Sequence, residues 1–279
     1  MKQFILSLLV SVFISSLSAQ GLTKYGEVTS TASNYVNKNG AVGVTAVNKY
    51  GRAFTNTGIN NALALDGSDD YVALPPAVYF SGNFTIECWV YPRSFSNWAR
   101  IIDFGNGAGS NNVLLAYTYG TSGAPGFYVE GGQFAATQTL VLNQWSHIAA
   151  TLNGTSATIY INGIAAGTAT FTTPVNVTRN NCYIGKSNWA DPNANAIFDE
   201  LRIWNTARTQ SEIQSSMNTE LTGAEAGLVS YYNFNQGVAG GTNTGVTSLT
   251  DNTVNNRNGT VTNFALTGTT SNWVTGPTL

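Results

Sequence analysis

The stretch Phe84-Thr85-Ile86-Glu87-Cys88-Trp89-Val90 alternates with a period of two along its length. This period is typical of a β-strand that buries one face, because successive side chains of a strand point to opposite sides of the sheet. The side chains expected on the buried face are Phe84, Ile86, Cys88 and Val90. Trp89 is expected on the opposite face, together with Thr85 and Glu87.

Short strand patterns of this kind recur along the chain. They are expected at 63–65, 71–74, 100–104, 113–119, 126–130, 147–152, 158–161, 182–185, 198–204 and 228–234. Asn153-Gly154 and Asn162-Gly163 stand where tight hairpin turns require positive φ. Many short strands at regular spacing indicate an all-β fold, in which two antiparallel sheets pack into a sandwich.

One short helix is predicted near the C-terminal side. Thr209-Gln210-Ser211-Glu212 forms a capping box, in which Thr209 is the N-cap and Glu212 reaches back to it. Ile213 and Met217, four residues apart, give the next turns an apolar side. The helix is expected to end near Leu221.

The N-terminus has the three parts of a secretory signal peptide over residues 1–19. Lys2 precedes the apolar run 4–14, and the small residues at 17–19 predict cleavage before Gln20. The apolar run is shorter than the ~20 residues of a membrane span. No cysteine follows the cleavage point to carry a lipid. We therefore expect export to the extracellular space or the cell surface.

The rest of the chain divides by composition into three segments. A lead segment covers 20–58, the series of strands covers 59–236, and a Gly-, Asn- and Thr-rich extension covers 237–279. Both end segments are expected either to be loosely ordered or to add strands at a sheet edge. Only 9% of residues are charged, the formal net charge is −2, and no basic run occurs. Nucleic acid is therefore a poor candidate partner, since its binding depends on clustered basic residues.

The only two cysteines are Cys88 and Cys182. In an exported protein an even number of cysteines is consistent with a disulfide bond. The alternative is that each is a small buried side chain on its own strand. The sequence leaves both interpretations open.

The order of several motifs resembles laminin-G-like jelly rolls. Their opening strands are matched by 64–72 and 84–90, their central hairpin by 144–148 and 157–163, and their closing strand by 198–205. The same order is similar to that of pentraxins, which share the concanavalin A-like architecture. The resemblance implies a two-sheet jelly-roll sandwich over roughly 60–236. It also implies binding of glycans, glycoproteins or cell surfaces, often with calcium.

Catalysis finds little support in the sequence. His147 is the only histidine, and its place beside Trp145 in a strand motif favours a structural role. Glycoside hydrolysis needs two carboxylates across the scissile bond. Asp199 and Glu200 are expected on opposite faces of a strand, so they do not form such a pair. The Glu-x-Asp-x-x-Glu strand that glucanases of this fold share does not occur.

A calcium site is one interpretation of the acidic residues. Asp66, Asp69 and Asp70 cluster in one turn, and Asp199 is expected to approach Asp69 and Asp70 across the sandwich. Calcium prefers six to eight such oxygen ligands. Asp side chains also bond the backbone of tight turns, so turn chemistry explains the cluster equally well. The pentraxin resemblance implies a second calcium region, at Asn111-Asn112 and 188–191, although Asp191 is its only acidic residue.

Ligand recognition is predicted in the loops that carry tryptophan and asparagine together. Aromatic rings stack on the C–H faces of sugars, while Asn and Asp bond the hydroxyl groups. The predicted ligand-binding residues are Asn97, Trp98, Asn112, Asn188, Trp189 and Asp191. Tyr117, Tyr119 and Tyr128 are expected on strands that line a concave sheet face, and Trp89, Trp145 and Trp204 are assigned to packing. The alternative is that the loop aromatics cap the core.

Together these features predict a secreted, non-catalytic module that binds a glycan or glycoprotein, with calcium as a possible aid. The alternative is a structural or adhesive domain of a larger surface or secreted protein. A polysaccharide-cleaving enzyme is the third hypothesis, and it requires a pair of carboxylates in the concave face. The sequence does not identify the ligand or the oligomeric state.

Overall fold

The computed structural model describes residues 44–47, 53–55 and 60–279. The predicted signal segment lies outside the described residues, so export stays a prediction. The chain divides into two compact units, 1–59 and 60–279. In the first unit, β1 (Val44–Val47) pairs with β2 (Ala53–Thr55) in an antiparallel sheet.

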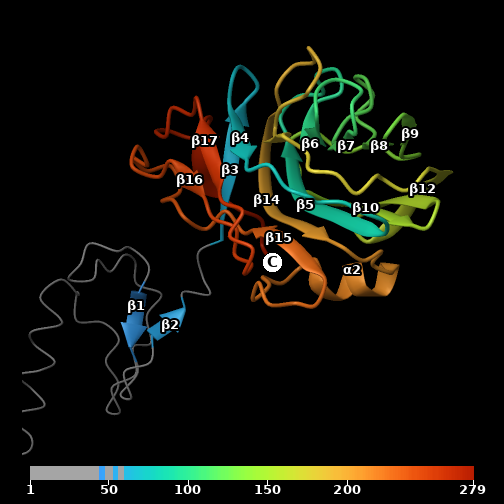
Figure 1. Cartoon of the computed structure of the whole chain (residues 1–279). Coiled ribbons are helices and arrows are strands. Elements are labelled where there is room, and N and C mark those ends of the chain that lie inside the picture. The colour runs from blue at the N-terminus through green and yellow to red at the C-terminus, as the bar shows by residue number, and fades with distance from the viewer. Residues whose placement is uncertain (1–43, 48–52, 56–59) are drawn as a thin grey trace, which may run out of the picture. The chain divides into compact units, whose positions relative to one another are not determined.

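The second unit is a sandwich of two antiparallel eight-stranded sheets, as predicted. One sheet, here called the covered sheet, has the order β12-β11-β10-β5-β14-β3-β18, and β15 also pairs with β14. The other, here called the open sheet, has the order β16-β17-β4-β13-β6-β7-β8-β9. Figure 1 shows the two layers face to face.

The strands of the covered sheet are β3 (Asn61–Asp66), β5 (Phe84–Pro92), β10 (Ser146–Asn153), β11 (Ser156–Ile161), β12 (Ile164–Thr170), β14 (Asn195–Trp204), β15 (Leu228–Tyr232) and β18 (Asn272–Thr275). Those of the open sheet are β4 (Tyr71–Leu74), β6 (Arg100–Gly105), β7 (Val113–Ala116), β8 (Gly126–Val129), β9 (Gly132–Ala135), β13 (Asn181–Ile184), β16 (Ser248–Leu249) and β17 (Gly259–Thr262).

The core lies between the sheets and contains the face of β5 that its alternation predicted. Its four apolar side chains are completely buried: Phe84, Ile86, Cys88 and Val90. Phe84 packs on Phe80 and Phe127, with ring centroids 4.7 and 5.9 Å apart. Such aromatic contacts add to the free energy gained by burying apolar surface.

Cys88 and Cys182 are both buried free thiols, so the disulfide is absent. Cys88 lies in β5 of the covered sheet and Cys182 in β13 of the open sheet. Each Sγ contacts a backbone carbonyl instead, that of Asp199 for Cys88 and that of Arg179 for Cys182. The interpretation of the two residues as small buried side chains is therefore confirmed.

Residues 237–279 add strands to both sheets, which was one of the two expectations for this segment. β17 pairs with β4 in the open sheet, and β18 pairs with β3 in the covered sheet. Trp273 of β18 is fully buried in the core. This segment is thus part of the same compact unit as the predicted jelly roll.

The predicted helix exists but is shorter than expected. Helix α2 (Gln210–Ser216) starts at the capping box of Thr209 and Glu212, in which each residue bonds the backbone of the other. It ends at Met217. There the buried guanidinium of Arg202 donates to the carbonyls of Ser216 and Thr219, in place of the backbone N–H groups that a further helical turn would supply. Figure 1 shows α2 against the side of β5 and β10 that faces away from the open sheet. Among the described residues, no helix has the length and hydropathy to span a bilayer.

A β-bulge in β14 overturns the expectation that Asp199 and Glu200 lie on opposite faces. Asp199 pairs with Trp89 and Arg202 with Glu87, so the register shifts between them, and Glu200 has a φ of 52°. A bulge inserts one extra residue and breaks the alternation. Glu200 consequently bonds Arg202 and Tyr231 on the outer face, where Asp199 also lies. Both carboxyls are fully buried.

The two predicted hairpin turns differ in outcome. Asn162 and Gly163 have φ values of 50° and 72°, as a primed turn requires. Asn153 instead pairs with Ser156 at the end of β10, and only Gly154 has positive φ there. The turn is therefore centred one residue later than predicted.

Candidate functional site

The open sheet has a hollow of about 410 Å³ on its outer face. The residues that line it are Trp98, Arg100, Gly109, Leu114, Tyr128, Gln133, Trp189 and Asp191. Leu114 of β7 lies opposite Tyr128 of β8, which lies opposite Gln133 of β9. The period of two in each strand places these three side chains on the same face, with their neighbours Leu115 and Phe127 in the core.

Arg100 is the centre of the hollow and is only 3% exposed. Its guanidinium carbon lies 5.2 Å from the ring centroid of Trp98 and 5.7 Å from that of Trp189. It also donates to the carboxylate of Asp191 at 2.8 Å and contacts that of Asp103 at 3.4 Å. Burial lowers the pKa of Arg100 from its ordinary value, and the two carboxylates counteract this. The guanidinium therefore holds both tryptophans, while its charge is balanced locally.

Asp103 of β6 lies under the hollow and is completely buried. Its Oδ1 accepts from the side-chain amides of Asn112 and Asn188, at 3.0 and 2.9 Å. Its Oδ2 accepts from the backbone N–H of Asn188 at 2.9 Å. Burial raises the pKa of Asp103, and these donors limit the rise. Asp103 thus fixes the 188–191 loop to the sheet.

The backbone at Trp98 is strained. Its φ of 51° lies in the left-handed region, which costs a bulky residue about 1–3 kcal/mol. Two bonds hold it there, from Trp98 N–H to the carbonyl of Gly120 and from Arg100 to the carbonyl of Trp98. A Cβ at Gly126 would stand 3.2 Å from the Trp98 ring, so glycine allows the indole to approach β8. The loop is built to present this ring at the hollow.

The structure brings the predicted ligand residues to one region but gives them unequal access. Trp98, Trp189 and Asp191 line the hollow, and each is half-buried. Asn97 is exposed beside them and donates to Asp191 at 3.0 Å. The two remaining asparagines, Asn112 and Asn188, bond Asp103 beneath the hollow and do not line it. Their roles in binding stay predictions.

The sequence reasoning missed Arg100, Leu114 and Gln133. Arg100 and Leu114 were treated only as strand residues, and Gln133 lies in β9, for which no strand was predicted. The available signal was Trp98-Ala99-Arg100, in which an arginine follows a loop tryptophan by two residues. The sequence alone does not show that the distant 188–191 loop brings Trp189 and Asp191 to Arg100 as well.

The aromatic residues on the strands divide between core and hollow. The expectation that Tyr117 lines the concave face is wrong. This residue follows the end of β7 and is buried in the core against Phe198. Tyr119 packs on Trp98, with ring centroids 4.4 Å apart, and Tyr128 packs on Trp189 at 5.7 Å. Both therefore support the walls of the hollow.

The tryptophans assigned to packing do pack. Trp204 is 2% exposed and has the guanidinium of Arg208 4.0 Å from its ring centroid. Trp145 lies against Tyr91, at a centroid distance of 5.5 Å. Trp89 donates its indole N–H to the carbonyl of Met217, at the end of α2.

His147 is buried on the outer face of the covered sheet. Its Nε2 is 3.5 Å from a carboxylate oxygen of Glu87, and its ring packs edge-on against Trp89. Because α2 closes this region, His147 has no exposed surface through which a substrate could reach it. Its environment agrees with the structural role expected from the sequence.

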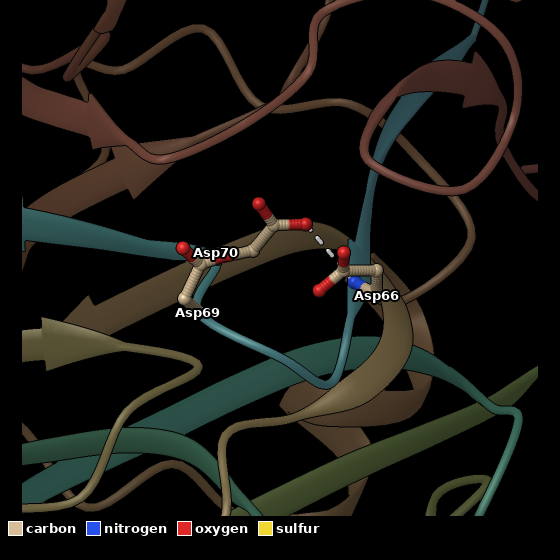
Figure 2. A group of neighbouring side chains, drawn as sticks. All are labelled: Asp66, Asp69 and Asp70. Carbon is tan, nitrogen blue, oxygen red and sulfur yellow. Dashed lines mark hydrogen bonds between the residues drawn. The ribbon is translucent and has the colours of Figure 1, made fainter.

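Asp66, Asp69 and Asp70 form an acidic cluster at the turn between β3 and β4. One carboxylate oxygen of each lies within 4.8 Å of the others, close enough for one metal ion to contact all three. Figure 2 shows the three side chains around the turn, with Asp70 accepting from the Asp66 N–H. Burial raises the pKa of Asp70 to about 6, and the charges of Asp66 and Asp69 contribute.

Asp199 does not join this cluster. Its Oδ2 accepts from Asn60 at 2.8 Å and its Oδ1 from the backbone N–H of Glu200. Burial and the neighbouring Glu200 raise the pKa of Asp199 well above its ordinary value. The predicted convergence of Asp199 with Asp69 and Asp70 therefore fails, because β14 pairs along β3 and carries Asp199 away from the turn.

Comparison with known sequences matches this chain to one family model. The model, Laminin_G_3, is described as the concanavalin A-like lectin/glucanases superfamily and matches residues 66–214. The match contains every residue that lines the hollow and the whole acidic cluster. The sequence has no significant match among curated proteins.

Solved structures share the fold at low sequence identity. A putative carbohydrate-binding protein from Bacteroides ovatus is 20% identical, with a TM-score of 0.57 over 73% of this chain. This chain covers 58% of the length of that protein. Domain 4 of AbnA, an extracellular arabinanase from Geobacillus stearothermophilus, was solved in complex with arabinotriose. It is 24% identical, with a TM-score of 0.48, and the match covers 58% of this chain and 79% of that domain. A pentraxin from Limulus polyphemus is 15% identical, with a TM-score of 0.43, over 56% and 80% of the two chains.

Proposed function

The chain belongs to the concanavalin A-like lectin/glucanases superfamily, and on this premise we propose that it is a non-catalytic module that binds a glycan in the hollow of the open sheet. The single observation that carries the proposal is the set of three half-buried rings, Trp98, Tyr128 and Trp189, around one hollow. We also propose that the module acts outside the cell, in agreement with its signal-like N-terminus.

Aromatic walls and polar edges suit a sugar. Rings that expose one face provide an apolar surface for the C–H groups of a pyranose or furanose. Asp191 and Gln133, which also line the hollow, supply a carboxylate and an amide for its hydroxyl groups. Because Arg100 is held by two carboxylates and two rings, these walls are already in place before a ligand binds, which lowers the entropic cost of binding.

The carboxylates at the hollow are better suited to support than to hydrolysis. Asp103 is buried and its oxygens accept three short hydrogen bonds, while Asp191 is bonded to Arg100 and Asn97. A glycosidase needs one carboxyl group to donate a proton and another to attack or activate water. Neither group is free for these roles without breaking the bonds that build the hollow, so we infer binding without cleavage.

The acidic cluster supports a second part of the proposal, that calcium binds at the β3–β4 turn. Asp66 and Asp69 offer carboxylate oxygens at the surface, and calcium prefers such hard oxygen ligands. A cation there would favour the ionised form of Asp70, whose pKa is raised. Isothermal titration with CaCl₂ after EDTA treatment checks this, and Asp69→Asn is expected to weaken the binding.

Glycan binding is tested by screening the full chain on a glycan array, in EDTA and in calcium, followed by titration calorimetry with each hit. Trp98→Ala and Trp189→Ala should each weaken binding at least tenfold. Trp145→Ala is the matched control, since this half-buried indole packs on Tyr91 at the covered sheet and should leave affinity unchanged. Absence of binding under both conditions, or equal loss in all three variants, would refute the proposal. Release of reducing sugar from a hit would refute its non-catalytic part.

A further inference from the structure

A second group of aromatic and charged side chains lies on the open sheet. Tyr71 of β4 and Tyr183 of β13 meet edge to face, with ring centroids 5.6 Å apart. The ammonium nitrogen of Lys186, just after β13, lies 4.1 Å from the Tyr71 centroid and 5.0 Å from that of Tyr183. All three side chains are partly exposed. We call them the tyrosine–lysine group.

This group is on the same face as the hollow. Tyr183 lies opposite Asp103 of β6, Asp103 opposite Leu114 of β7, and Leu114 opposite Tyr128 of β8. Residues paired in this way point to the same side of a sheet. Leu114 and Tyr128 line the hollow, so a single row of side chains connects it to Tyr183. Three strand spacings of ~4.8 Å separate Tyr183 from Tyr128, or about 15 Å.

Lys186 forms no ion pair with a carboxylate of the described residues. It is the only lysine between residues 60 and 279. Arg100, the cation of the hollow, is by contrast paired with Asp103 and Asp191. The open face therefore has one end at which the cation is ion-paired and one at which the cation forms no ion pair.

The chemistry around Lys186 suits an anionic oxygen. An ammonium group has three donors, and contact with the tyrosine faces leaves it directions open to solvent. In the described part of the chain, no side chain or carbonyl accepts from the hydroxyl groups of Tyr71 or Tyr183. These hydroxyls can add donors to the same anion.

We propose that the glycan held by the open sheet is acidic, with one sugar in the hollow and a carboxylate or sulfate of a nearby sugar bound by Lys186, Tyr71 and Tyr183. This inference rests on the proposed glycan-binding function and adds the class of ligand. It predicts a preference that a neutral binding site would not have, because the hollow alone carries no uncompensated positive charge.

The test compares acidic glycans with matched neutral ones on the full chain in EDTA. An array of neutral, uronate-bearing and sulfated glycans is followed by titration calorimetry with oligogalacturonate and its methyl ester, and with a carrageenan oligosaccharide and its desulfated form. An acid preference in only one pair identifies the anion as carboxylate or sulfate.

Lys186→Gln should weaken the affinity for the preferred acidic ligand about fivefold and leave the affinity for its neutral partner unchanged. This is the effect expected of a partly exposed ion pair of about 1 kcal/mol. Lys186→Arg should retain the preference.

Arg93→Gln is the control for overall charge, because Arg93 bonds the carbonyls of Thr269 and Thr270 and has no place at the hollow. It should leave both members of each pair unaffected. If only neutral glycans bind, or if Lys186→Gln does not change the preference while Trp98→Ala still weakens binding, the acidic ligand is refuted and the proposed function stands. If no glycan binds, both fail. A melting temperature of Lys186→Gln equal to that of the wild type establishes that the fold of the variant is intact.

Discussion

The outer faces of the two sheets hold similar residues in opposite environments. On the covered sheet, α2 and the chain after it bury Glu87, His147 and Arg202 completely. On the open sheet, Trp98 and Trp189 stay half-buried around a hollow, while the supporting Arg100 and Asp103 are buried.

This difference shows that the covering layer, rather than residue type, decides what such residues do. Arg202 uses its donors on Glu200 and on two carbonyls of the segment that covers it, so its bonds attach that segment to the sheet. Arg100 instead bonds Asp191 and lies between two tryptophan rings, so it shapes a surface. The first arrangement serves stability and the second serves recognition.

The largest effect on stability is expected from Arg202→Ala, which removes a buried cation from the covered sheet. The variant leaves the buried carboxyl of Glu200 with Tyr231 as its remaining side-chain donor. Removing one partner of a buried ion pair lowers the free energy of unfolding by about 3–5 kcal/mol. Urea denaturation measures the loss. Arg93→Ala, at a half-buried arginine bonded to carbonyls, should cost much less, and an equal loss in both variants would contradict the comparison.

Asp70→Asn tests the turn that connects the two sheets. The pKa of Asp70 is raised to about 6, so its protonated form is favoured in the folded state. Its stabilising contribution is complete below about pH 4 and is lost as the pH rises through about 6. The stability of the wild type relative to Asp70→Asn should therefore fall by about 2 kcal/mol between pH 4 and pH 7 in EDTA. Urea denaturation at four pH values measures this, and a difference independent of pH would contradict it.

Trp98→Ala should separate recognition from stability on the open face. We expect a loss of glycan affinity of at least tenfold, which corresponds to about 1.4 kcal/mol. The cost in unfolding free energy should be smaller, because the Trp98 ring is only half-buried and its removal therefore exposes less apolar area than the loss of a core ring. Calorimetry and urea denaturation on the same sample give both values. Trp204→Ala, at a fully buried ring, should show the reverse pattern.

The smallest effect is expected from Thr209→Ala, which loosens the start of α2. It removes the side-chain acceptor of the Glu212 N–H and should cost about 1 kcal/mol. The melting temperature measures it. Ser215→Ala, on the exposed side of the same helix, serves as the control and should change stability by less than half as much.

Local patterns predicted those parts of the fold that local chemistry controls. The alternation of β5 and the capping box of α2 were both confirmed, because each depends on neighbours within a few residues. The end of α2 was predicted too late, since Arg202 fixes it from another strand. The faces of Asp199 and Glu200 were predicted wrongly because a bulge depends on the pairing partner as well as on the strand itself.

The candidate site was predicted in part for the same reason. Trp98 and Trp189 stood out as loop tryptophans beside asparagines, and both line the hollow. Arg100 did not stand out, because its importance comes from two rings and two acids that the fold collects from separate segments. Asp199 was placed at the acidic turn by assuming that the sandwich brings them together, whereas the register of β14 on β3 keeps them apart.

The pairing of the last strand with the first strand of the sandwich has a consequence for how the protein assembles. β18 joins β3, and β17 joins β4, so both sheets gain partners from the end of the chain. Contacts this distant in sequence close large loops and make folding slow. Until residues 259–275 arrive, the edges of β3 and β4 keep unpaired N–H and C=O groups that can recruit another chain. A chain that lacks residues 259–275 is therefore exposed to aggregation, and the pairing of these residues is what protects both edges.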